Sequence, residues 1–197
     1  MLVFPGFELL DVFGPLEMFG RLSERARLLV VAPAPGPVPS HQGPACVAEA
    51  AFAGELGLDV LLVPGGMGTR PLVADPAFLA ELRRQCGAAR WVGSICTGSA
   101  LLAKAGVLDG RRATTNKRSY AWATAQGPRV QWVPEARWVE DGKYFTSAGV
   151  SAGMDMALAL IARTLDRAAS LEAAAGAEYE WHEDPAWDPF ARMNGLV

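Results

Sequence analysis

The hydrophobic positions of this chain form short apolar runs that alternate with segments of helical periodicity. Apolar runs predict strands at residues 1–4, 27–32, 59–63 and 91–95. The run at 59–63 has no polar alternation, which is typical of a strand covered by helices on both faces. Apolar residues spaced three or four apart predict helices at residues 7–19, 76–85, 97–105, 150–165 and 168–179. This alternation favours an α/β fold, a three-layer sandwich with a mainly parallel sheet and helices on both faces.

Turn and cap residues refine these boundaries. Gly14 and Pro15 predict a break within the first helix, because proline removes a helical hydrogen bond. Asp75 before Pro76 predicts a capped helix start, and Asn116 predicts a cap for a helix over residues 117–125. The remaining expectations are a loop at 33–44, an edge strand at 45–50, a strand at 112–115, a hairpin at 137–146 around Asp141-Gly142, and an aperiodic tail at 180–190 on the surface or in a subunit contact.

Cys96 lies where a predicted strand changes into a predicted helix. A side chain on such a turn projects above the end of the sheet, and the turn tolerates only small neighbours such as Ser94 and Gly98. The segment therefore indicates a nucleophile elbow with cysteine in place of serine. The helix N-terminus is expected to lower the pKa of the thiol. The alternative is a small buried cysteine that only packs.

Two further features fall just beyond predicted strands. Gly65 and Gly66 follow the strand at 59–63 and could turn backbone N–H groups toward a developing negative charge, or form a plain flexible turn. Asp11 lies among apolar residues, and its residue pattern alone favours a helix cap or a water-facing side chain over a buried carboxylate. Because ligands bind beyond the carboxyl ends of parallel strands, these residues and Cys96 can converge.

Composition excludes several classes of protein. The 197 residues fit one domain, residues 1–197, with 51% hydrophobic and 20% charged residues. A net charge of −3 argues against nucleic-acid binding. Three cysteines, no recognisable signal peptide and no long apolar run predict a cytoplasmic protein that does not enter the membrane. His41 and His182 are far apart and no zinc spacing is present, so neither a metal nor a cofactor is expected.

Several segments together resemble the ThiJ/PfpI family of the class I glutamine amidotransferase-like, flavodoxin-like fold. They span nearly the whole chain: residues 4–7 and 10–15, Val63-Pro64-Gly65-Gly66, Ser94-Ile95-Cys96-Thr97-Gly98, residues 112–115, and residues 146–155. Within this family, residues 10–15 and 96–98 are most similar to isonitrile hydratases and to sensory domains of transcription regulators.

The resemblance implies roles for individual residues. Cys96 would be the nucleophile, Asp11 its acidic partner, and the N–H groups of Gly66 and Thr97 an oxyanion site, with Thr97 also contacting the ligand. Gly65, Asn116 and Gly149 are expected to bind a small-molecule substrate. Members of this family are commonly homodimers, so a homodimer is expected here.

Two positions depart from part of the family. Peptidase-like and deglycase-like relatives carry a histidine at the position of Thr97 or of Asn116. Neither threonine nor asparagine can act as an imidazole base, which disfavours protease, amidase, glyoxalase and deglycase activity.

Three functions remain open, in order of preference. The first is a cysteine enzyme resembling isonitrile hydratase, in which the Cys96 thiolate attacks a small electrophile and a protonated Asp11 acts as general acid. The second is a redox or ligand sensor that uses Cys96 without turnover. The third is the ligand-binding domain of a regulator, which would need a partner chain to supply a DNA-binding domain.

Overall fold

A four-stranded sheet forms the centre of the computed structural model, which describes residues 1–22 and 24–197. The strand order is β5-β6-β10-β9, in which β5, β6 and β10 run parallel and β9 runs antiparallel to β10. These strands are β5 (Val60–Val63), β6 (Trp91–Ser94), β10 (Tyr144–Ser147) and β9 (Trp138–Asp141).

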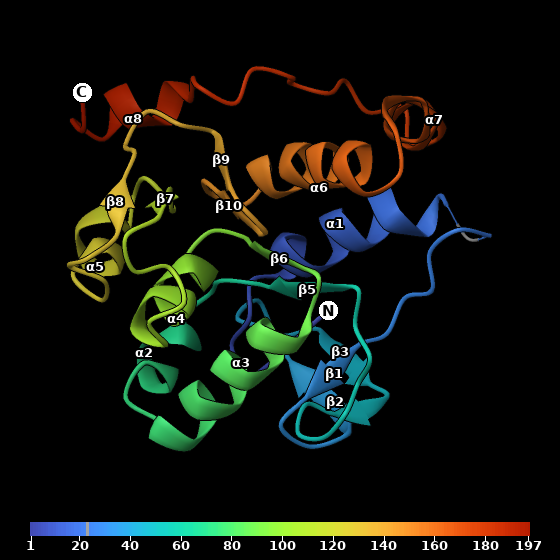
Figure 1. Ribbon diagram of the computed structural model, residues 1–197, viewed down its shortest axis with the longest axis vertical. Coiled ribbons are helices and arrows are strands. Elements are labelled where there is room, and N and C mark those ends of the chain that lie inside the picture. The colour runs from blue at the N-terminus through green and yellow to red at the C-terminus, as the bar shows by residue number, and fades with distance from the viewer. Residues whose placement is uncertain (23) are drawn as a thin grey trace.

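Helices cover both faces of this sheet (Figure 1). On one face lie α1 (Leu9–Gly20) and α6 (Ala152–Thr164), which pack against each other, and on the other lie α3 (Pro76–Ala88) and α4 (Gly98–Lys104). The predicted three-layer α/β sandwich with a mainly parallel sheet is confirmed. Asp75 caps α3 as predicted, because its Oδ1 accepts the N–H groups of Ala77 and Phe78, both at 3.0 Å.

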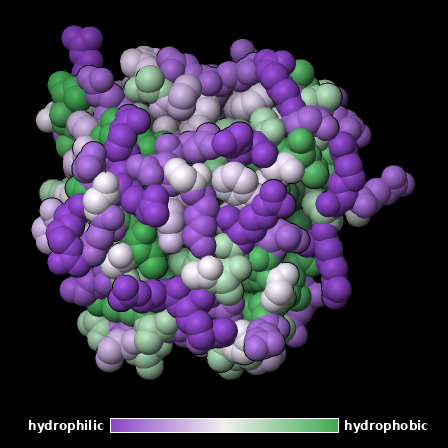
Figure 2. All heavy atoms as spheres, viewed as in Figure 1, coloured by the Kyte–Doolittle hydropathy of each residue, from purple (hydrophilic) through white to green (hydrophobic). Residues whose placement is uncertain are grey.

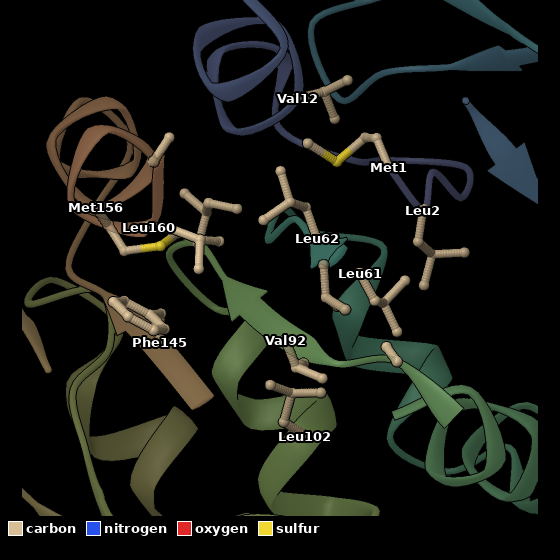
Figure 3. Close-up of a cluster of buried hydrophobic side chains, with 14 of the residues drawn as sticks. Met1, Leu2, Val12, Leu61, Leu62, Val92, Leu102, Phe145, Met156 and Leu160 are labelled. Atoms are coloured by element: carbon tan, nitrogen blue, oxygen red, sulfur yellow. The ribbon is translucent and has the colours of Figure 1, made fainter. Parts of the chain in front are cut away.

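The core lies between these layers (Figure 3). Val92 of β6 points toward Leu102 of α4, whereas Phe145 of β10 lies beside Met156 of α6 on the opposite side of the sheet. All four side chains are completely buried. Side chains on both faces of these strands are buried under helices, which explains why the strands have no alternating polar residues.

The amino-terminal segment extends the sheet without forming a named strand. Leu2 makes an isolated parallel bridge to Val31, and its N–H donates to the Leu62 carbonyl oxygen at 3.0 Å. The segment therefore lies between β5 and the short pair β1 (Val31–Ala32) and β4 (Ala50–Ala51). The predicted first strand is correct in position but is reduced to a single bridge.

The predicted loop at residues 33–44 is wrong in part. β2 (Gly36–Pro39) pairs antiparallel with β3 (Ala45–Ala48) outside the central sheet. Proline is tolerated in β2 because that strand pairs on one side only, so the missing N–H groups leave no ladder bond unmade. Proline-rich composition therefore concealed an edge strand.

The predicted break at Pro15 is also wrong, since α1 continues through it as one helix. Gly14 brings α1 close to α6: a Cβ at Gly14 would lie 2.8 Å from Cγ of Met154. Pro15 is itself buried. Tertiary packing therefore holds a helix that local propensity would interrupt.

The carboxyl-terminal half contains the predicted hairpin and several short elements. Asp141 pairs with Tyr144, so the turn residues are Gly142 and Lys143, one position later than expected. The expected helix over 117–125 is shorter, because Lys117 turns inward to donate to Thr114 Oγ1 and the Ala136 carbonyl oxygen. The short elements there are β7 (Arg112–Ala113), α5 (Tyr120–Thr124), β8 (Gln131–Trp132) and α8 (Pro189–Met193). The longer α7 (Arg167–Gly176) also lies in this half, whereas the short α2 (Thr69–Leu72) lies in the amino-terminal half.

Hydrophilic residues dominate the face shown in Figure 2, and the hydrophobic residues there form separate small groups. Across residues 1–22 and 24–197, no helix combines the length and the apolar character needed to cross a bilayer.

Candidate active site

Cys96 occupies the turn between β6 and α4, as the sequence predicts. Its φ of 55° lies in the left-handed region, which costs a non-glycine residue about 1–2 kcal/mol. The Cys96 N–H donates to the Ala148 carbonyl oxygen (3.1 Å), which ties the turn to the end of β10. Gly98 is required beside it, because a Cβ there would lie 2.3 Å from the Val63 carbonyl oxygen. The backbone therefore has the strained, closely packed form of a nucleophile elbow, with Cys96 6% exposed.

The environment of the Cys96 sulfur raises the pKa of the thiol. Burial is the largest cause, and the charge of Asp11 raises the pKa further. Backbone hydrogen bonds from Thr97 and Val150 lower it without offsetting these two effects. The expectation of a lowered thiol pKa is therefore wrong. The reason is that burial disfavours the sulfur anion more than the nearby N–H groups at the helix start stabilise it.

Asp11 lies on α1 and is completely buried, so the expectation of a cap or a water-facing side chain is wrong. Its Oδ2 accepts the Gly65 N–H at 2.8 Å, whereas its Oδ1 has no hydrogen-bond partner among the described residues. Burial raises the pKa of Asp11 well above its usual range. The Gly65 N–H and the Cys96 thiol lower this pKa, and the nearby Glu8 raises it.

Gly65 is the contact point of three segments. A Cβ at this position would lie 2.5 Å from the Thr97 nitrogen and 2.9 Å from Asp11 Oδ2. Only glycine therefore allows α1, the loop after β5 and the elbow to approach one another. The structure thus brings together Asp11, Gly65 and the Cys96-Thr97 turn, which the sequence placed beyond separate strands.

The two predicted oxyanion donors are both already engaged. The Gly66 N–H donates to Thr97 Oγ1 at 3.1 Å, and the Thr97 N–H is directed at the Cys96 sulfur. Gly66 has a φ of 116° and lies against the backbone of Phe7 and Glu8, so a side chain would not fit there. The Gly66 N–H can face an oxyanion only if the Thr97 hydroxyl releases it.

Asn116 and Gly149 are in close contact, and the residues that precede them both hydrogen-bond to the Cys96 backbone. A Cβ at Gly149 would be 2.5 Å from Asn116 Nδ2, and the Oδ1 of Asn116 accepts the Ser119 N–H at 2.8 Å. The preceding Thr115 donates its hydroxyl to the Cys96 carbonyl oxygen at 3.1 Å. Asn116 therefore accepts a hydrogen bond of the kind expected for a helix cap, and the neighbouring Thr115 links this segment to the elbow.

Three residues near the sulfur were missed by sequence reasoning. Val150 donates its N–H to Cys96 from a left-handed conformation (φ 42°), for which a β-branched residue gives no signal. Glu8 is half-buried and raises the pKa of both Asp11 and Cys96. Its spacing of three from Asp11 on one helix face could have indicated this. The third is Arg70. Its signal in the sequence is that it is the one charged residue between Asp59 and Asp75.

No cluster of three or more His, Cys, Asp or Glu side chains suited to a metal ion occurs within the described part of the chain. All three cysteines are free and buried.

An α/β sandwich with a strained cysteine on a strand-to-helix turn, next to a buried carboxyl group, defines a class of cysteine-elbow proteins. Residues 1–163 match the model of the DJ-1/PfpI family. The chain belongs to this family.

Curated relatives include proteins of two kinds. An isonitrile hydratase from Pseudomonas putida is 38% identical over 161 residues, which are 81% of this chain and 68% of that protein. A helix-turn-helix transcriptional regulator from Pseudomonas aeruginosa, CdhR, is 33% identical over 167 residues, and the aligned part covers 82% of this chain and 49% of the regulator.

Solved structures support the same assignment. A ThiJ/PfpI family protein from Pseudomonas syringae has a TM-score of 0.84 and 33% identity, covering 100% of this chain and 84% of that one. DJ-1beta from Drosophila melanogaster, at 21% identity, covers 91% and 96% of the two chains with a TM-score of 0.78, and shows the fold alone.

Proposed function

We propose that this protein is a cysteine-dependent enzyme that hydrates a small isonitrile-like electrophile. The observation that carries the proposal is the buried Asp11 carboxyl, which interacts with the Cys96 thiol and whose Oδ1 has no hydrogen-bond partner among the residues that the structure describes. The 38% identity to an isonitrile hydratase supports the reaction class. Neither imidazole hydrogen-bonds to Cys96 or Asp11 in the described residues, so a carboxyl group is the acid and base at hand.

The raised pKa values of Cys96 and Asp11 mean that the pair keeps one proton over a wide pH range. Burial disfavours both anions, and their mutual repulsion opposes loss of the second proton. The proton can lie on sulfur, leaving Asp11 ionised as a base, or on Asp11, leaving a thiolate. A base whose pKa is raised toward that of the thiol suits this exchange better than an ordinary aspartate.

In the first step the Cys96 sulfur attacks the terminal carbon of the isonitrile and forms a carbon–sulfur bond. Asp11 takes the thiol proton and delivers it to the same carbon, giving a thioimidate with a new carbon–hydrogen bond. Water then adds across the carbon–nitrogen double bond, placing hydroxyl on carbon and hydrogen on nitrogen. The carbon–sulfur bond breaks, the hydroxyl proton returns to sulfur through Asp11, and an N-substituted formamide leaves.

The test is incubation with cyclohexyl isonitrile, with formamide followed by chromatography. We expect turnover by the wild type, and a Cys96-linked thioimidate adduct in the mass spectrum during turnover. Cys96→Ala should abolish both, whereas Cys46→Ala, which removes a thiol outside the site, should leave both unchanged. Absence of formamide and of any adduct at Cys96 in the wild type would exclude the proposed reaction.

A ligand-sensing role is the second candidate, supported by the 33% identity to the regulator CdhR. The raised thiol pKa disfavours the peroxide-sensing form of this role, because the thiolate is the species that peroxide oxidises. Saturable binding of an isonitrile without formamide release would favour ligand sensing over catalysis.

A further inference from the structure

Arg70 is linked to the elbow by a chain of hydrogen bonds through threonine side chains. It belongs to α2, directly after the glycine-rich loop, and its Nη1 donates to Thr69 Oγ1 at 3.0 Å. Thr69 Oγ1 lies 3.4 Å from Thr97 Oγ1, on the residue that follows Cys96. Arg70 is thus connected to the site through two threonine hydroxyls.

The guanidinium of Arg70 is held in place by uncharged groups. Its Cζ lies 3.4 Å from the centroid of the Trp122 ring, and its Nη2 donates to Ser119 Oγ at 3.3 Å. The hydrogen bonds to Thr69 and Ser119 use two of its five N–H donors, and the contact with Trp122 fixes the plane of the group. Trp122 and Ser119 follow Asn116, so the same segment that borders the elbow also orients Arg70.

Arg70 differs from the other shielded arginines of the described chain. Three arginines are not fully exposed: Arg70, Arg111 and Arg137. Arg111 pairs with Asp141 and Arg137 with Asp155, whereas Arg70 has no carboxylate within 4.0 Å among residues 1–22 and 24–197. A fixed, half-buried guanidinium with free donors and no counter-ion is suited to bind an anion, and its fork matches a carboxylate.

We propose that Arg70 binds an anionic group of the substrate while Cys96 attacks the electrophilic carbon. Resting on the proposed function, this makes the substrate class a small isonitrile that carries a carboxylate. Arg70 is then a specificity-determining residue. Burial lowers the pKa of Arg70, and the charge of Cys96 opposes this shift, so the two groups are close enough to interact.

The first experiment measures anion recognition without requiring catalysis. Iodoacetate and iodoacetamide both alkylate Cys96 by displacement of iodide and differ mainly in the carboxylate. We expect the iodoacetate-to-iodoacetamide rate ratio at Cys96, followed by peptide mass spectrometry, to fall about 10-fold in Arg70→Gln, the loss of one charge-assisted interaction. Arg83→Gln, which removes the same charge from an exposed position, should keep the ratio within about twofold. An equal fall in both variants, no fall in Arg70→Gln, or no alkylation of Cys96 in the wild type would overturn the proposal.

A measurement on the wild type alone covers the case in which Arg70→Gln does not fold. Acetate should slow the alkylation of Cys96 by iodoacetamide in a saturable way, whereas acetamide at the same concentration should not. Equal protection by both would overturn the proposal.

The second experiment compares turnover of isocyanoacetate with turnover of its uncharged methyl ester. In Arg70→Gln, kcat/KM for the acid should fall about 10-fold, while kcat/KM for the ester stays the same. Turnover with an unchanged acid-to-ester preference would refute anion recognition and leave the proposed function standing. Arg70-dependent alkylation without turnover of either isonitrile would refute the proposed function and leave anion recognition standing.

Discussion

Asp11 and Asp155 are both completely buried, yet they have opposite surroundings. Asp11 accepts one backbone N–H, has no hydrogen-bond partner on Oδ1, and has no cation within 4.0 Å in the described residues. Asp155 has partners on both oxygens and a counter-ion. Both carboxyl groups are equally buried, so they differ in the hydrogen-bond donors and the counter-ion that offset the cost of burying a charge.

Asp155 is the centre of a complete polar cluster. Arg137 contacts its Oδ2 through Nε at 2.7 Å and Nη2 at 2.6 Å. The Tyr179 hydroxyl and the His182 N–H donate to Oδ1 at 2.9 Å and 3.0 Å. The carboxyl-terminal tail is thereby attached to α6. His182 takes part through its backbone N–H.

The comparison separates structural carboxylates from reactive ones. The charge of Asp155 is neutralised by Arg137, and both of its oxygens accept hydrogen bonds. These contacts stabilise the ionised form, so Asp155 is not suited to transfer a proton. Asp11 is destabilised as an anion, and its free oxygen can hold or release a proton. Substitutions at the two sites should therefore affect different quantities.

The largest effect is expected for Asp155→Ala, which leaves the buried Arg137 guanidinium without a counter-ion. We expect the free energy of unfolding to fall by about 3–5 kcal/mol, measured by urea denaturation. Asp59→Ala, which removes an exposed carboxylate, should change it by less than about 0.5 kcal/mol. A loss below about 1 kcal/mol for Asp155→Ala would mean that the cluster does not stabilise the fold.

Asp11→Asn should affect activity instead. Asparagine can still accept the Gly65 N–H but cannot carry the proton, so kcat/KM for isonitrile hydration should fall about 100-fold or more. The pKa of Cys96, measured from the pH dependence of its alkylation by iodoacetamide, should decrease because the repulsion from Asp11 is lost. Glu17→Gln, an exposed change on the same helix, should alter neither quantity. An unchanged kcat/KM in Asp11→Asn would remove Asp11 from the mechanism.

The stability of Asp11→Asn should also depend on pH in a defined direction. The folded-state pKa of Asp11 is raised, so its favourable contribution to stability is fully present below its unfolded value of 3.8 and is lost as the pH rises through the folded value. The variant lacks this loss. Its stability relative to the wild type should therefore increase above about pH 4 and level off at higher pH, as followed by urea denaturation. A constant difference across this range would show that the Asp11 pKa is not raised.

Local sequence patterns predicted the parts of the site that depend on local backbone geometry. Cys96 between small residues and Gly65 after a buried strand are each determined by neighbours along the chain, and the structure has both where they were expected. The motif at residues 146–155 was equally visible in the sequence, but it gave no role to Val150 or Asp155. A motif marks a fold position without separating an N–H donor to sulfur from a structural carboxylate.

The features that could not be predicted from the sequence depend on contacts between residues far apart in the chain. The burial of Asp11 depends on the approach of Gly65, 54 residues later, and the pKa of Cys96 depends on that same burial. The position of Arg70 depends on Trp122 and Ser119, which no local pattern connects to α2. Propensity also failed at Pro15, where packing against α6 overrides it.

The smallest effect tests whether the Asp155 cluster is as fully compensated as its geometry indicates. Tyr179→Phe removes one of two donors to Oδ1, and the His182 N–H remains, so we expect a loss of about 1 kcal/mol in urea denaturation. Tyr120→Phe is the matched control, because the Tyr120 hydroxyl has no hydrogen-bond partner in the described residues, and its loss should be below about 0.5 kcal/mol. A loss near that of Asp155→Ala would show that Tyr179 is indispensable to the cluster. An equal, negligible effect of both tyrosine changes would mean that Arg137 and His182 alone stabilise Asp155, and that a buried aspartate needs fewer partners than the comparison with Asp11 implies.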